Sequence, residues 1–359
     1  MFYFVSFEVD VKIIVVIVLF LSFISSCKNN DSIGFDLPDE CCGKCEIASG
    51  LNGFSDSVIN ASAAFSNCIC LESGTFEGEI RLSKPIRLIG RADGSSRLKS
   101  ITIANAGETL LSSLRIGGSA VENAAVTVVS SDVTLDRVRI ENVTAAALAG
   151  GRGITVSGKK SRVELRNSVI DGVEGSGILI DGGHDIRLQN ASISNCGFGG
   201  VWFQNQDGGQ ASLVIEKSNI YRTGALSVEL LGNIFLGAYG SSFGEVGKRE
   251  LAGGTAGDGI VIKPGFSAPE EFAELEDIVI SGFPRAGMIF DGEELEKGVG
   301  GVRLKNIRLV SESGSYGIVS QNFAGFTPVV DGDVENPFAG NDAALTSPLP
   351  LFDTPLELE

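Results

Sequence analysis

Aliphatic residues recur through most of this chain about every two dozen residues, and this periodicity restricts the possible folds more than any other feature. Stretches such as 163–180, 186–203 and 213–230 each contain a strand, a polar bend, a second strand, a glycine-bearing turn and a third strand. The first strands end in a column formed by Leu88, Leu111, Leu135, Leu165, Leu188, Ile215, Leu275 and Leu304, with Leu236 assigned to the one double-length gap. The third strands form a second column, at spacings of 23 to 32 residues: Ile101, Val126, Ile154, Ile178, Val201, Val228, Ile260, Met288 and Ile318.

Such short strands cannot bury their apolar side chains singly, so successive repeats must stack on one another. The triplets 154–156 and 178–180 alternate as strands do and lack the 3.6-residue period of a helix. The leucine-rich-repeat signature is absent, and a propeller blade needs a longer repeat. The sequence therefore predicts an all-β fold, a parallel β-helix solenoid of about nine or ten turns with three sheets around an apolar interior.

The bend between first and second strands is occupied by a column of polar residues: Arg137, Asn167, Asn190, Lys217, Asp277 and Asn306. Asn and Asp tolerate left-handed backbone, so the column predicts a sharp corner repeated in register. Residues 73–90, SGTFEGEIRLSKPIRLIG, resemble the opening turns of pectin-lyase-like right-handed β-helix proteins. This resemblance extends over residues 54–322 and implies a right-handed coil. Enzymes of that superfamily bind polysaccharide along a lateral sheet.

The predicted organisation is a signal peptide at 1–26, a cysteine-containing segment at 27–53, the β-helix at 54–322, and a C-terminal cap and tail at 323–359. An open β-helix exposes sheet edges, so both ends need covers. Residues 55–66 begin with Ser55 and Asp56 and carry a short amphipathic pattern, which predicts a cap helix. Residues 237–257 are predicted to leave the repeat as a glycine-rich excursion.

Residues 13–24 form an apolar run that is short for a membrane span and fits the core of an export signal. The following Ile24-Ser25-Ser26-Cys27 resembles the lipobox of bacterial lipoproteins, which implies lipidation at Cys27 and a membrane-anchored protein of the bacterial cell envelope. A plain signal peptide or a short anchor is the alternative. Glu8 and Asp10 precede the apolar run, which suggests a translation start near Val11.

Seven cysteines fit an exported protein better than a cytosolic one. With Cys27 assigned to lipid, the disulfide candidates are Cys41, Cys42, Cys45, Cys68 and Cys70. These spacings also suit zinc, but an oxidising compartment favours disulfides between the two segments. Cys196 lies far along the chain and is expected to be a free, buried thiol.

The chain of 359 residues has 28 Lys and Arg against 45 Asp and Glu, a net charge of −17. This balance disfavours nucleic acid as a partner. The acidity is compatible with calcium binding, but the sequence shows no recognisable set of calcium ligands. The sequence therefore predicts no cofactor and no metal site.

The middle residue of each third strand points outward, in the column Thr102, Thr127, Thr155, Leu179, Trp202, Glu229, Val261, Ile289 and Val319. An exposed Trp202 would be a candidate ligand-binding residue that stacks on a sugar ring. The favoured alternative is that the 237–257 excursion or the C-terminal tail covers this half-apolar column.

Candidates for catalysis are Asp171, Asp181 and His184, with Glu174 and Asp185 nearby. Glycoside hydrolysis needs two suitably spaced carboxylates, which adjacent turns can supply. However, Asp171 and Asp181 each precede glycine, as turn residues do, and the motifs of active polygalacturonases are absent. The sequence therefore favours a lipid-anchored, non-catalytic scaffold or carbohydrate-contacting protein, with a polysaccharide lyase or glycoside hydrolase as the alternative.

Overall fold

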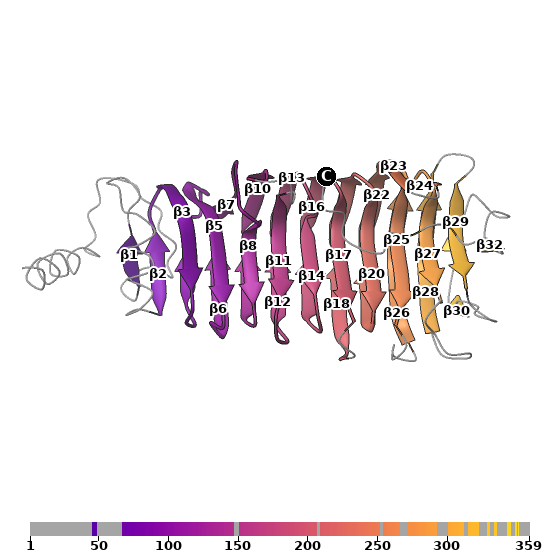
Figure 1. Ribbon diagram of the computed structural model, residues 1–359, viewed down its shortest axis with the longest axis horizontal. Helices are drawn as coiled ribbons and strands as arrows, with labels where there is room; N and C mark the ends of the chain where they lie inside the picture. Colours follow the sequence, from indigo (N-terminus) through magenta and orange to yellow (C-terminus); the bar gives the residue numbers. More distant parts are fainter. Residues whose placement is uncertain are drawn as a thin grey trace, which may run out of the picture.

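The computed structural model describes residues 45–48, 67–146, 151–206, 209–251, 254–265, 271–292, 301–311 and 315–322, the short stretches 329–330, 334–335 and 343–345, and Leu349 and Leu351. In these residues the chain winds into a rod whose strands stack side by side along its long axis (Figure 1). Successive strands of each sheet are parallel and come from successive turns, as in a β-helix.

The first sheet comprises β1 (Glu46–Ala48), β2 (Cys68–Leu71), β4 (Arg87–Ile89), β6 (Glu108–Ser112), β9 (Asp132–Asp136), β12 (Arg162–Arg166), β15 (Asp185–Gln189), β18 (Ala211–Glu216), β21 (Ile234–Tyr239), the first halves of β26 (Glu271–Ser281) and β28 (Gly301–Val310), and β30 (Val329–Val330). The second sheet comprises the first parts of β3 (Gly74–Leu82) and β5 (Ser96–Ala104), β7 (Arg115–Ile116), β10 (Arg139–Val143), β13 (Val169–Val173), β16 (Ser192–Cys196), β19 (Asn219–Thr223), β22 (Ser242–Val246), the second halves of β26 and β28, and β31 (Val334–Glu335). The third sheet comprises the second parts of β3 and β5, β8 (Ala124–Val129), β11 (Arg152–Ser157), β14 (Ile178–Asp181), β17 (Gly199–Asn205), β20 (Leu226–Gly232), β25 (Asp258–Pro264), β27 (Ala286–Asp291), β29 (Tyr316–Gln321) and β32 (Ala343–Leu345).

The predicted aliphatic columns are confirmed by the strand register. All nine residues from Ile101 to Ile318 are direct neighbours along the third sheet. In the first sheet one assignment is wrong, because the residue aligned with Ile215 is Ala238 and not Leu236. Leu236 lies two residues earlier on the same strand and therefore also points into the core, since strand side chains alternate with a period of two. These columns form one buried cluster that runs through the rod.

The predicted bend column is also confirmed. Its six residues have φ between 48° and 57°, the left-handed region, and Gly240 supplies the corner in the repeat between Lys217 and Asp277. The side-chain amide of Asn190 donates to Asn167 (2.8 Å), and that of Asn167 donates to Asp136 (3.0 Å). Cross-turn bonds of this kind hold successive corners in register.

Two expectations about the repeats need correction. The number of turns differs slightly from the nine or ten predicted, and at the N-terminal end of the rod β3 and β5 each continue from the second sheet into the third. The first half of the predicted 237–257 excursion is a regular turn made by β21 and β22, and the chain leaves the coil only after Val246.

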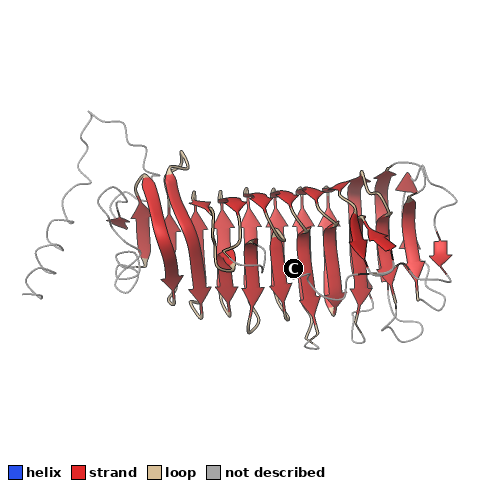
Figure 2. Cartoon of the chain, turned by 45° about the horizontal axis from the view of Figure 1, so that its top comes forward, coloured by secondary structure: helices blue, strands red, loops and turns tan. Residues whose placement is uncertain are grey.

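The ends of the solenoid extend beyond the predicted boundaries, with β1 at one end and β30 to β32 at the other. The predicted cap helix at 55–66, the signal segment and Cys27 lie outside the described residues. The described part contains no helix and hence none that is long and apolar enough to cross a bilayer (Figure 2).

Candidate functional site

The outward column of the third sheet is present as predicted, from Thr102 to Val319, but most of it is covered. Thr102 and Thr127 are half-buried, whereas Trp202, Glu229 and Val319 are at most 1% exposed. The interpretation in which a segment covers Trp202 is therefore correct, and the exposed sugar-stacking ring is not observed.

An antiparallel hairpin covers the middle of this column. It consists of β23 (Arg249–Leu251) and β24 (Gly254–Ala256) and follows the turn made by β22. Ala256 belongs to a buried cluster with Trp202, and the rings of Trp202 and Phe198 lie 5.4 Å apart. The Arg249 guanidinium sits 5.1 Å above the Phe198 ring, a cation–π contact that holds the hairpin against the sheet.

A buried ion pair lies where the hairpin rejoins the coil. Asp258, the first residue of β25, accepts hydrogen bonds from two nitrogens of Arg285 in the next turn, one of them at 2.8 Å from Nε. The side chains are only 2% and 10% exposed. Burial raises the pKa of the Asp258 carboxyl, and the bonds from Arg285 oppose that shift.

The C-terminal tail covers the far end of the same face. Leu349 and Leu351 pack against an apolar cluster that contains Val261, Ile289 and Val319. The Gln321 side chain fixes the tail, since its amide donates to the Leu349 carbonyl (3.1 Å) and its oxygen accepts from the Leu349 amide (2.9 Å). The third sheet therefore offers little open lateral surface beyond its first turns.

His184 lies in the interior of the coil, where its ring contacts backbone groups. It is fully buried, its Nδ1 accepts from the Ser161 amide (3.0 Å), and its Nε2 lies 2.8 Å from the Asp181 carbonyl oxygen, to which it donates. In the two preceding turns the hydroxyls of Ser161 and Ser131 accept an amide in the same way. His184 thus continues an internal ladder of corner hydrogen bonds, and both ring nitrogens are used by backbone.

The candidate carboxylates do not converge. Asp171 lies on β13 in the second sheet, and hydrogen bonds from Ser194 (2.7 Å) and Asn195 (2.6 Å) hold its pKa below the usual range. Asp181 ends β14 in the third sheet, where its exposed carboxylate accepts from Gln204 (3.1 Å). Only Asp181 and His184 are neighbours, and they meet through a backbone carbonyl.

The first sheet has an open lateral surface with a pocket. A pocket of about 290 Å³ is lined there by Lys160, Asp185, Gln210, Ala211, Ser212 and Phe235. Asp185, Ser212 and Phe235 are register partners on β15, β18 and β21, so they form one outward row across three turns. We call this the Phe235 pocket.

The polar groups of the Phe235 pocket are arranged around a half-buried aromatic ring. The Asp185 carboxylate accepts from the Ser212 hydroxyl (2.9 Å) and pairs with the Lys160 ammonium (3.0 Å). Gln210 is exposed at the rim. An aromatic wall with a few convergent polar groups is the usual composition of a small-ligand site.

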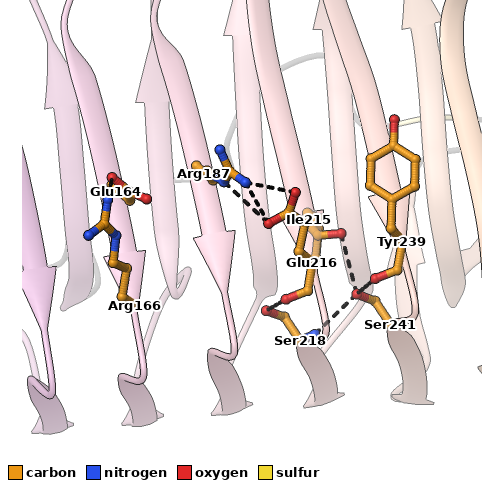
Figure 3. Close-up of polar contacts among 8 residues, drawn as sticks. All are labelled: Glu164, Arg166, Arg187, Ile215, Glu216, Ser218, Tyr239 and Ser241. Atoms are coloured by element: carbon orange, nitrogen blue, oxygen red, sulfur yellow. Dashed lines mark hydrogen bonds and ion pairs between the residues drawn. The ribbon is translucent and has the colours of Figure 1, made fainter.

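A second aromatic residue extends this surface along β21. A Cβ placed on Gly237 would lie 3.0 Å from the Tyr239 ring and 3.2 Å from the Phe235 ring, so the two rings close over the glycine. The Tyr239 hydroxyl donates to Glu274 (2.9 Å), and burial with this bond raises its pKa to about 12. Figure 3 shows the ring extending along its strand, beside the Arg187–Glu216 pair. We call Phe235, Gly237 and Tyr239 the β21 platform.

Sequence reasoning missed the Phe235 pocket and the β21 platform because β21 was assigned in part to an excursion. The available signal was the alternation Phe235, Gly237, Tyr239, which places two aromatic residues on one face of a strand.

The cysteines at the N-terminal end form disulfides. Cys45 is bonded to Cys68, which joins the segment before β1 to the first residue of β2, and Cys70 is also disulfide-bonded. The three sulfurs lie within 4.8 Å of one another, but bonded sulfurs are not thiolate ligands for zinc. Cys41 and Cys42 lie outside the described residues. Cys196 is free, and burial raises its pKa to about 12.

Comparison with known proteins supports the fold. The family model described as "Right handed beta helix region" matches residues 94–243. The chain folds as a right-handed parallel β-helix. A search of curated proteins finds no match.

Several solved structures are similar to this chain at low identity. The catalytic domain of a GH87 alpha-1,3-glucanase variant in complex with nigerose is 13% identical, with a TM-score of 0.41 over 81% of this chain and 68% of that one. An alginate lyase from Paenibacillus sp. str. FPU-7 is 12% identical, with a TM-score of 0.40 over 81% and 99%. The A-module of the Azotobacter vinelandii mannuronan C-5 epimerase AlgE6 is 10% identical, with a TM-score of 0.38 over 79% and 95%.

Proposed function

We propose that this β-helix is a non-catalytic, polysaccharide-contacting protein of the bacterial cell envelope. The observation that carries the proposal is the Phe235 pocket, where a half-buried ring meets a carboxylate, an ammonium, a hydroxyl and an amide. Sugar rings have apolar C–H faces that pack on aromatic rings and hydroxyls that exchange hydrogen bonds with such polar groups.

The composition of the pocket favours binding over hydrolysis. Glycoside hydrolysis uses two carboxyl groups, one with a raised pKa. The lining of the Phe235 pocket contains one carboxylate, Asp185, and this group is ion-paired with Lys160. A single ion-paired carboxylate can accept hydrogen bonds from sugar hydroxyl groups and so position a bound glycan, but it does not form the pair of carboxyl groups that hydrolysis uses.

The cellular address is part of the proposal and rests on residues 13–27. A diacylated or triacylated Cys27 would hold the rod at a membrane without a spanning helix. Metabolic labelling with palmitate is expected to mark the wild-type chain and not the Cys27→Ser variant. Equal labelling of the two chains would overturn lipidation at Cys27.

Replacing Phe235 with alanine is expected to weaken glycan binding at least about tenfold, because the aromatic wall of the pocket is lost. A glycan array identifies bound polysaccharides, and titration calorimetry with the full-length chain measures their affinity. Val279→Ala is the matched control, since Val279 is an exposed apolar residue (39%) on the second sheet. Undiminished binding by Phe235→Ala, or release of products from the bound glycan by the wild type, would contradict the proposal.

A further inference from the structure

We propose that the glycan crosses the rod along β21, with one sugar ring in the Phe235 pocket and a following ring on Tyr239. The glycan class that fits is a neutral chain of equatorially linked pyranoses. The inference rests on the proposed function and adds the direction, length and charge of the ligand.

The first argument is the continuity of the aromatic surface. Phe235 and Tyr239 are four residues apart on one face of the strand, so they span roughly 13 Å of sheet, the length of a short oligosaccharide. Gly237 lies between them, is buried, and would place a Cβ within 3.2 Å of both rings. The rings therefore form one surface along the strand instead of two separate patches.

The second argument is that the described register neighbours of these two rings do not continue the aromatic surface along the rod axis. The neighbours of Tyr239 in the adjacent turns are Glu216 and Glu276, and both are ion-paired, with Arg187 and Lys305. The neighbour of Phe235 toward the N-terminus is the polar Ser212. A ligand that stacks on both rings must therefore lie across the rod.

The third argument concerns charge. Four cations at the edge of this surface are each ion-paired with carboxylates: Lys160 with Asp185 (3.0 Å), Arg187 with Glu216 (2.8 Å), Lys305 with Glu276, and Arg303 with both Glu271 (3.2 Å) and Glu274 (3.6 Å). An anionic glycan would have to compete with carboxylates already bound to these cations. A neutral chain does not compete with these carboxylates for the cations, and its equatorial substituents leave apolar ring faces free for stacking.

Gly237 and Tyr239 then determine specificity for chain length. A side chain at position 237 would separate the two rings, because its Cβ has no room between them. The hydrogen bond from Tyr239 to Glu274 positions the ring, while the ring itself supplies the contact.

The test is calorimetric titration of the full-length chain with cellobiose and cellohexaose, and with a hexamer of galacturonate as the anionic comparison. Wild type is expected to bind cellohexaose at least about tenfold more tightly than cellobiose and more tightly than the anionic hexamer. Tyr239→Ala and Gly237→Val are expected to lower the cellohexaose affinity to that of cellobiose, whereas Tyr239→Phe keeps most of the gain. Thermal unfolding of each variant verifies that the coil is intact.

The outcomes separate the two proposals. If Phe235→Ala loses binding of any array glycan while Tyr239→Ala binds long and short chains as wild type does, the crossing path is wrong and the pocket stands. If wild type binds the galacturonate hexamer more tightly than cellohexaose, or does not bind cellohexaose, the neutral class is wrong. If Phe235→Ala binds as wild type does, both proposals fail.

Discussion

Arg285→Ala is expected to lower the free energy of unfolding by about 3–5 kcal/mol at pH 7, because it leaves the Asp258 carboxylate buried without its charge partner. Asp258 is 2% exposed and accepts two hydrogen bonds from the guanidinium. Urea unfolding monitored by circular dichroism measures the loss. Arg303→Ala is the matched control: its exposed pairs with Glu271 and Glu274 are expected to contribute less than about 1 kcal/mol.

The loss caused by Arg285→Ala should depend on pH in a stated direction. Burial raises the folded-state pKa of Asp258 above its unfolded value, and removal of Arg285 raises it further. A raised folded pKa stabilises the protein at low pH, and this stabilisation is lost as the pH rises through that pKa. The difference between variant and wild type should therefore be smaller near pH 4 than at pH 7. A pH-independent difference, or an equal loss in the Asp258→Ala/Arg285→Ala double variant, would show that the unpaired charge is not the cause.

Gly224→Ala is expected to cost about 3 kcal/mol of unfolding free energy, since a methyl group would have to displace rigid backbone. A Cβ on Gly224 would lie 2.0 Å from the carbonyl oxygen of Gly197 in the preceding turn. Gly197 sits in the same way on the carbonyl of Glu174, so the corner is a stack of close backbone contacts. A backbone movement that relieves the contact at Gly224 would therefore also displace Gly197 against Glu174 in the turn before it.

The control for Gly224→Ala is Gly209→Ala, where a Cβ would meet nothing within 4 Å. Its unfolding free energy is expected to stay within about 0.5 kcal/mol of wild type. Urea unfolding of the two variants compares the same chemical change at a crowded and an open position. Similar stability of Gly224→Ala and wild type would mean that the turns can separate at this corner.

The inward columns were predictable because they depend on local rules. Side chains alternate along a strand, and each turn places its residues directly above those of the preceding turn, so one aliphatic position per repeat identifies the core. The whole column from Ile101 to Ile318 follows from this rule, as do the left-handed corners at Asn167 and Asn190. The assignment of Leu236 failed because an offset of two residues leaves the inward pattern unchanged.

The surface was not predictable in the same way, because its exposure depends on segments distant in sequence. Trp202 is outward by its position in the strand, yet it is buried because the hairpin strands β23 and β24 fold back over it. Val319 is buried against a tail about thirty residues further along the chain. The two-residue alternation of a strand predicts which side chains point outward, but it does not predict which of them another segment will cover.

The sequence by itself therefore determined the coil, its interior and its corners, since these repeat in every turn and need only neighbouring turns for their contacts. The tertiary structure alone decided which outward positions of the third sheet are covered. Its folded-back hairpin and tail cover the third sheet, and β21 brings Phe235 and Tyr239 together over Gly237 on the first sheet. The packing of the hairpin and the tail on the third sheet joins segments that are distant in sequence and does not repeat from turn to turn, so only the folded chain reveals it.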